Sequence, residues 1–120
     1  MCKMIPFEGE KRVADIKLHH IRNIVDQAAF AKNINRIMLF GSATEERCSE
    51  YSDIDIAVFG SLPKSAYLQS KEFKAFQDAV FRFDFSQDYD ILYFSDSKPH
   101  SDPILHDVLK GTEIYRRSGI

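Results

Sequence analysis

The chain has 120 residues, of which 44% are hydrophobic and 28% charged, and its formal net charge is −2. This length suits one domain that buries its own core, and the composition is that of an ordinary globular protein. Scattered lysines and arginines in a weakly acidic chain argue against strong nucleic-acid binding. No apolar run approaches the roughly 18 residues of a membrane helix.

We therefore expect a single domain over residues 1–120, without a membrane segment. Cys2 and Cys48 are the only cysteines, and they show neither metal-binding nor redox spacing. The N-terminal residues lack the apolar core and cleavage site of a signal peptide. A cytoplasmic location with both cysteines as free thiols is the resulting expectation.

The first half of the chain alternates between helical and extended patterns. Apolar residues recur at helical spacing over residues 10–32, which predicts an amphipathic helix. A short apolar strand is expected over residues 36–40, followed by one helical turn over residues 42–47. Apolar and other residues then alternate with period two over residues 54–59, which predicts a second strand.

The second half repeats the alternation. A second amphipathic helix is expected over residues 65–83 and a third strand over residues 90–94. A last helix is expected between Asp102 as its N-cap and Gly111 just past its end, followed by a short strand or tail. This order of elements predicts a compact sheet with helices packed on it.

Two carboxylates stand at the start of the second strand. Residues two apart in a strand point to the same face, roughly 6.5–7 Å apart, so Asp53 and Asp55 are expected to project together. Two carboxylates this close repel each other unless a cation lies between them. Hard oxygen ligands on a rigid strand suit Mg²⁺, although an isolated Asp-x-Asp is more often a solvated turn.

The Gly41-Ser42 pair at the end of the preceding strand offers a phosphate-binding turn beside these carboxylates. Glycine lets the backbone turn sharply and approach a ligand, and the free N–H groups of a following helical turn favour an anion. Asp90, which opens the third strand, offers a third carboxylate for a two-metal site. Phosphate on one side and paired carboxylates on the other form a layout for phosphoryl or nucleotidyl transfer.

The joint pattern resembles the nucleotidyltransferase superfamily that includes DNA polymerase beta, and in particular its minimal (MNT) domains. The family's motif is a hydrophobic residue with Gly-Ser, about ten residues, then Asp-hydrophobic-Asp, and a later strand carrying Asp. The corresponding segments here are "LFGS" at 39–42, "SDIDIAV" at 52–58 and "YDIL" at 89–92, with a family-like tail "ILHDVLKGTEIYRR" at 104–117. The resemblance implies an α/β (α+β) fold with a palm-like core: a small mixed sheet of three to four strands flanked by about four helices.

The resemblance also implies roles for individual residues. Asp53 and Asp55 would bind two Mg²⁺ ions, and Asp90 would bind the catalytic metal and help to deprotonate the attacking hydroxyl. Gly41 and Ser42 would hold the terminal phosphates of a nucleoside triphosphate, expected to be ATP. The transferred group would be a nucleoside monophosphate, with pyrophosphate leaving.

One segment departs from the family's pattern. Many relatives follow Gly-Ser with a basic residue and a glycine, whereas Glu45 and Glu46 stand in this position here. Arg47 is the one positive residue of the segment and is the candidate to meet the triphosphate. Acidic side chains near a triphosphate weaken its binding through repulsion.

Three functions compete. The first is an enzyme that transfers AMP from ATP to a hydroxyl on a protein partner, as the antitoxin of a HEPN-toxin/MNT-antitoxin pair, because the chain has no separate acceptor domain. The second is a non-catalytic antitoxin that occludes a helical partner, which the acidic segment favours. The third is the catalytic subunit of a small-molecule (aminoglycoside-like) nucleotidyltransferase. The sequence leaves open whether the chain also forms a homo-oligomer.

Overall fold

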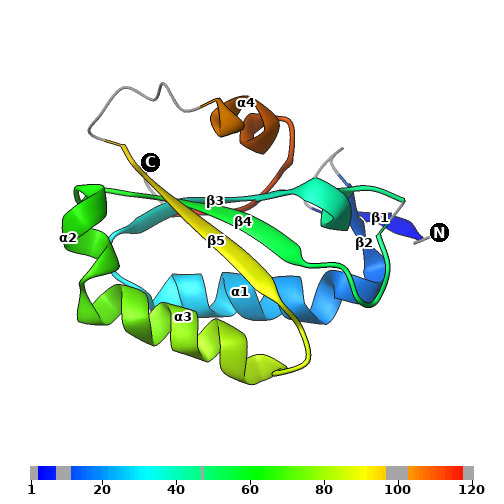
Figure 1. Cartoon of the computed structure of the whole chain (residues 1–120), viewed down its shortest axis with the longest axis horizontal. Coiled ribbons are helices and arrows are strands. Elements are labelled where there is room, and N and C mark those ends of the chain that lie inside the picture. Colours follow the sequence, from blue (N-terminus) through cyan, green and yellow to red (C-terminus); the bar gives the residue numbers. More distant parts are fainter. Residues whose placement is uncertain (1–2, 8–11, 47, 97–102, 118–120) are drawn as a thin grey trace.

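A four-stranded mixed sheet forms the middle layer of the chain (Figure 1). The computed structural model describes residues 3–7, 12–46, 48–96 and 103–117. The strands are β1 (Met4–Pro6), β2 (Arg12–Ala14), β3 (Ile34–Phe40), β4 (Ile54–Gly60), β5 (Tyr89–Ser95) and β6 (Thr112–Arg116). The α-helices are α1 (Leu18–Phe30), α2 (Lys64–Leu68), α3 (Lys71–Phe83) and α4 (Ile104–Leu109), and short 3₁₀ helices span Asp15–Lys17 and Gly41–Thr44.

The strand order in the main sheet is β5-β4-β3-β6. β3 pairs antiparallel with both β4 and β6, whereas β4 and β5 pair in parallel. The parallel pair requires a crossover, and α2 and α3 supply it between the end of β4 and the start of β5. The starts of β4 and β5 therefore lie side by side at the same end of the sheet.

The two faces of the sheet are covered unequally. Alternate residues such as Ile37, Ile56 and Val58 belong to the larger core cluster, which also contains buried residues of α1 and α3. On the opposite face Phe59 belongs to a smaller cluster with Val108 of α4. Figure 1 shows α1 and α3 below the sheet and α4 above it. The short α4 covers only part of its face.

The predicted fold class is confirmed, with four α-helices on a mixed sheet, but the first predicted helix begins too early. The segment Arg12–Ala14 is a strand that pairs with Met4–Pro6, and the 3₁₀ turn and α1 follow it. Val13 is fully buried. A buried apolar residue at this position is compatible with both a helix and a strand, so the spacing alone did not separate them. The segment forms a strand because Val13 pairs with Ile5, a contact that helical periodicity does not reveal.

The helix predicted over residues 65–83 is broken into α2 and α3. Ser70 is the N-cap of α3, and its hydroxyl oxygen accepts a hydrogen bond from the backbone N–H of Phe73 at 3.1 Å. Serine favours this cap because its side chain satisfies an otherwise unpaired N–H group of the first turn. The proposed cap at Asp102 lies outside the described residues.

The expectation of free thiols is wrong for Cys48. This residue is buried, with 4% of its surface exposed, and it is disulfide-bonded. Cys2 lies outside the described residues. Across the described ranges, no helix has the length and apolar character needed to cross a bilayer.

Candidate active site

The site is built where β4 and β5 begin. Asp55 and Asp90 are the second residues of these strands, and they are direct partners in the parallel register. Partners in a parallel pair point to the same face, which here is the face of Phe59 and Phe94. Asp53 lies one residue before β4. The structure thus brings the three predicted aspartates to one end of the sheet.

Their electrostatics reflect this proximity. Asp53 and Asp90 are exposed, whereas Asp55 is half-buried. Burial raises the pKa of Asp55, and the charges of Asp90 and Asp53 raise it further. None of the three forms a salt bridge with another described residue. Within the described part of the chain, no basic side chain at ion-pair distance relieves the mutual repulsion of this group.

The Gly41 turn lies directly against the carboxylate group. Gly41 has a φ of 74°, a backbone conformation that side chains other than glycine rarely adopt. A Cβ atom at this position would overlap the carboxylate of Asp55. The Thr44 hydroxyl donates a hydrogen bond to the Gly41 carbonyl at 2.7 Å, which fixes the 3₁₀ turn. Glycine is thus needed here both for the backbone angle and for the close approach of Asp55.

A cavity of about 620 Å³ opens between this turn and α4. Its described lining residues are Phe40, Gly41, Thr44, Glu45, Asp55, Ile104, Asp107, Lys110 and Gly111. Of these lining residues, Lys110 is the only one that is basic. Ser42 is half-buried and is not part of the lining, and Arg47 lies outside the described residues. Glu45, one of the acidic residues expected to weaken triphosphate binding, borders this cavity.

Sequence reasoning missed the contribution of α4. The helix reaches the site because Gly111, at its end, packs against the backbone of Leu39, where a Cβ atom would overlap the Leu39 carbonyl. Thr112 then pairs with Leu39 in the sheet. Gly111, which the sequence marks as a helix end, was the available signal for this contact. It was not sufficient, because the strand that Gly111 contacts lies more than 70 residues earlier in the chain.

All three aspartates offer the type of donor atom that magnesium prefers. Asp53, Asp55 and Asp90 supply only hard carboxylate oxygens. A cation would offset the repulsion by Asp90 and Asp53 that adds to the effect of burial in raising the pKa of Asp55. Among the described residues, no group of three or more His, Cys, Asp or Glu side chains is arranged so that it could hold a metal ion as it stands. Metal binding by the three aspartates stays a prediction.

Comparisons with known proteins identify the family and support the fold. The family model described as polymerase beta, nucleotidyltransferase matches residues 20–119, so the chain belongs to this family. The fold is similar to the crystal structure of a proposed nucleotidyltransferase from Sulfolobus solfataricus, with a TM-score of 0.52 and 16% identity over 88% of this chain and 87% of the other. No curated protein matches the chain. The predicted resemblance is confirmed, and nucleotidyl transfer is the general role of the domain.

The raised pKa of Asp55 leads to a prediction about stability. Because the folded protein holds this carboxyl protonated up to a higher pH than the unfolded chain does, its ionisation lowers stability as pH rises through the raised pKa. Without divalent metal, Asp55→Asn is therefore expected to raise Tm at pH 7, and the gain should shrink as pH falls below the pKa of Asp55. Thermal melts from pH 7 to pH 4 provide the measurement.

Asp26→Asn, an exposed position on α1, is the matched control and should change Tm little at any of these pH values. A lower Tm of Asp55→Asn at pH 7 would show that Asp55 stabilises the fold through contacts instead of opposing it through charge.

Proposed function

We propose that the chain is a magnesium-dependent nucleotidyltransferase that moves AMP from ATP to a hydroxyl on a helical protein partner. The observation that carries this proposal is the in-register pair of half-buried Asp55 and exposed Asp90 on the open face, where Asp55 lies against the Gly41 turn and lines its cavity. A structural role does not explain why like charges face each other on neighbouring strands, because such an arrangement costs stability. A site that recruits cations does explain it.

The proposed chemistry is a single displacement at phosphorus. The acceptor oxygen forms a bond to the α-phosphorus of ATP, the bond from this phosphorus to its bridging oxygen breaks, and pyrophosphate leaves. Asp90 accepts the proton of the acceptor hydroxyl. Asp53 and Asp55 would hold two Mg²⁺ ions, which supply charge neutralisation at the phosphates when bound. Gly41 permits the close approach of the turn to these groups.

The cavity between the turn and α4 is the proposed nucleotide site. Its volume suits a nucleotide-sized ligand, because small-molecule sites commonly occupy about 300–1,000 Å³. Lys110 is the basic side chain among its described lining residues, which also include the acidic Glu45 and Asp107. In the family's pattern an arginine after Gly-Ser can contact the triphosphate. We assign this contact to Lys110.

The proposed partner surface lies at the same end of the sheet as the aspartates. Tyr51 and Phe85 are 86% and 84% exposed, and Ile16 is also exposed. Ile16 and Tyr51 line a second cavity of about 330 Å³ together with Asp84 and Ser86, the neighbours of Phe85. We call Ile16, Tyr51 and Phe85 the mouth rim. A partner that covers the mouth rim would bring its hydroxyl close to Asp53 and Asp90.

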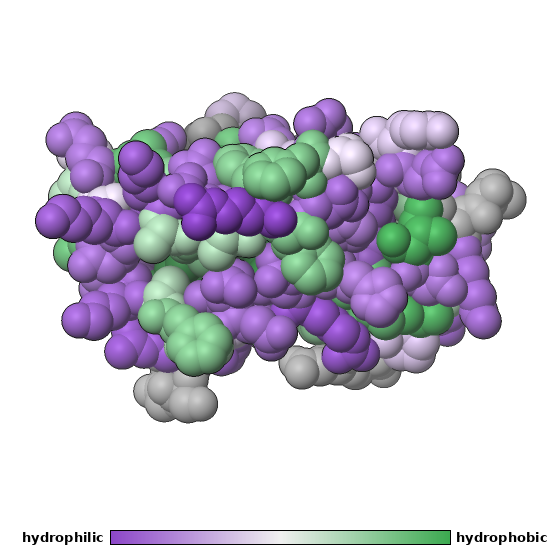
Figure 2. All heavy atoms as spheres, turned by 90° about the horizontal axis from the view of Figure 1, so that it is seen from below, coloured by the Kyte–Doolittle hydropathy of each residue, from purple (hydrophilic) through white to green (hydrophobic). Residues whose placement is uncertain are grey.

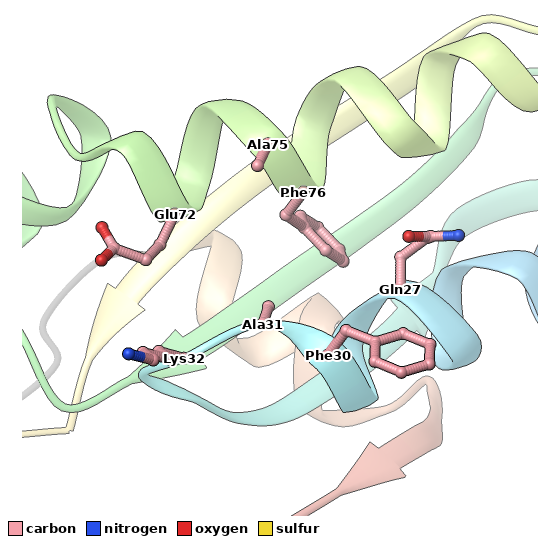
Figure 3. A pocket seen from close by; sticks show the side chains of 7 residues that line it. All are labelled: Gln27, Phe30, Ala31, Lys32, Glu72, Ala75 and Phe76. Carbon is pink, nitrogen blue, oxygen red and sulfur yellow. The ribbon is translucent and has the colours of Figure 1, made fainter.

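The helical side of the molecule offers a different apolar feature. Figure 2 shows this side, where apolar side chains surface at separate points among hydrophilic ones. Phe30, which is 86% exposed, borders a cavity of about 230 Å³ between the end of α1 and the start of α3 (Figure 3). This cavity lies at the end of α1 that is remote from Asp53, so it serves as an internal comparison for the mouth rim.

The second candidate function is an antitoxin that occludes a helical partner without catalysis. The observation that favours it is the acidic border of the cavity, where Glu45, Asp55 and Asp107 outnumber Lys110. An acidic border opposes a triphosphate unless cations accompany it.

The assignment of Lys110 predicts a specific kinetic change. Lys110→Ala should raise the KM for ATP by about tenfold with a smaller change in kcat, because a charge-assisted hydrogen bond to phosphate contributes to binding. Steady-state assays over a range of ATP concentrations measure it. Lys74→Ala removes an exposed lysine on α3 and should leave KM unchanged. Equal KM values for the Lys110→Ala and wild-type proteins would remove Lys110 from the nucleotide site.

The partner surface predicts a difference between two equally exposed phenylalanines. Phe85→Ala should weaken binding of the helical partner by about tenfold, as the loss of a buried aromatic contact does at interfaces. Phe30→Ala should leave the affinity unchanged. Calorimetric titration with the helical protein that co-purifies with the chain compares the two variants. Loss of affinity with Phe30→Ala alone would move the partner to the helical side.

The proposed reaction is tested on the protein and its partner together. With ATP and magnesium, mass spectrometry of the co-purified partner should detect an added AMP on a hydroxyl side chain, expected to be tyrosine. The added mass should vanish with Asp53→Asn, because this variant removes a metal ligand. Neutralisation of the partner that persists with Asp53→Asn, without any added AMP, would make the occluding antitoxin the better account.

A further inference from the structure

A buried lysine lies behind the site. Lys17 ends the 3₁₀ turn before α1, and only 1% of its surface is exposed. Its Nζ donates hydrogen bonds to the carbonyl of Ser52 at 2.7 Å, the carbonyl of Glu50 at 3.2 Å and Oε1 of Gln87 at 2.7 Å. All three acceptors are neutral oxygens. Burial of an ammonium group is costly, and burial lowers the pKa of Lys17, so the arrangement needs a physical reason.

Gln87 forms the second half of the same network. It is buried, and its Nε2 donates to the carbonyl of Ser52 at 2.9 Å and to the carbonyl of Asp88 at 2.7 Å. The Asp88 carbonyl also accepts the backbone N–H of Ile54 at 3.0 Å. Lys17 and Gln87 together therefore tie the segment before β4 to the segment before β5.

The tied segments are those that carry the carboxylates. Asp53 lies between Ser52 and Ile54, and both of these neighbours are held by the network. Asp90 follows Asp88 by two residues. A hydrogen-bonded support that fixes the backbone on each side of a ligand sets where that ligand points.

The charge of Lys17 acts in the same direction. The negative charge of Asp53 is the largest of the attractions that raise the pKa of Lys17 against the effect of burial, so the two groups are near each other. They form no salt bridge, because the ammonium group is already bonded to neutral oxygens. Asp53 thus keeps its oxygens available for a cation while a fixed positive charge partly offsets its repulsion with Asp55.

We propose that Lys17 and Gln87 form a clamp that positions Asp53 and Asp90 for binding of divalent metal. Lys17 does not border the cavity beside Gly41, so it acts through Asp53 and is a positioning residue, not a catalytic one. The inference rests on the proposed function, since it needs these aspartates to be metal ligands.

Direct metal binding tests the clamp. Mn²⁺, which prefers the same oxygen donors as Mg²⁺, is titrated into the nucleotide-free protein and its bound fraction is followed by electron paramagnetic resonance. Lys17→Met and Gln87→Met remove the hydrogen bonds and keep an unbranched side chain, equal in length to glutamine and slightly shorter than lysine. Each should weaken Mn²⁺ binding by about tenfold or more, the loss typical of removing support behind a ligand. Lys74→Met, at an exposed position, should bind Mn²⁺ as the wild type does.

The outcomes separate the two proposals. Titrations are made well below the Tm of each variant, so a purely structural role leaves Mn²⁺ affinity unchanged and overturns the clamp. If Lys17→Met does not fold, Gln87→Met alone decides. Asp53→Asn gives the baseline: equal binding by the wild type and Asp53→Asn would overturn the proposed function together with the clamp. Binding that depends on Asp53 but not on Lys17 or Gln87 would overturn the clamp alone.

Discussion

The parallel pairing of β4 with β5 is the constraint on which the rest of the structure depends, because it sets Asp55 directly beside Asp90. This pairing is unfavourable at its first residues, where burial and, beyond it, the charges of Asp90 and Asp53 raise the pKa of Asp55. It is favourable further along, where Ile56 and Val58 are fully buried against the helical layer. The apolar part of each strand therefore stabilises a sheet whose charged end opposes it, and the site exists because the core outweighs that repulsion.

The unequal cover of the two faces follows from the same pairing. A parallel pair needs a crossover, and α2 and α3 make it on the face that α1 also covers. The other face receives only α4, which packs over Phe59 and Phe94 toward the strand ends. The strand starts, with Asp53 and Asp90, stay open on that face. The cavity beside Gly41 lies where the Gly41 turn, Asp55 and one side of α4 come together on this face.

Local patterns in the sequence were enough to predict the main strands and helices and part of the site. Period-two alternation predicted β4 and the shared direction of Asp53 and Asp55, since both depend only on neighbours along the chain. The β1–β2 hairpin was missed because Val13 satisfies helical and strand patterns alike, and only its pairing with Ile5 decides between them. The disulfide at Cys48 and the buried hydrogen bonds of Lys17 were missed for a similar reason. The three hydrogen-bond partners of Lys17 lie 33 to 70 residues away, and no spacing rule records such contacts.

The charges around the site constrain how a nucleotide can enter it. Glu45, Asp55 and Asp107 border the cavity, and Lys110 is the basic residue among its described lining. Asp53 and Asp90 add negative charge at the same end of the sheet, where Lys17 is buried and bonded to neutral oxygens. A triphosphate without cations would therefore meet a net repulsive field, whereas a triphosphate that carries divalent cations would meet carboxylates suited to complete their coordination. The acidity that argues against nucleotide binding by itself thus becomes a reason for binding to depend on metal.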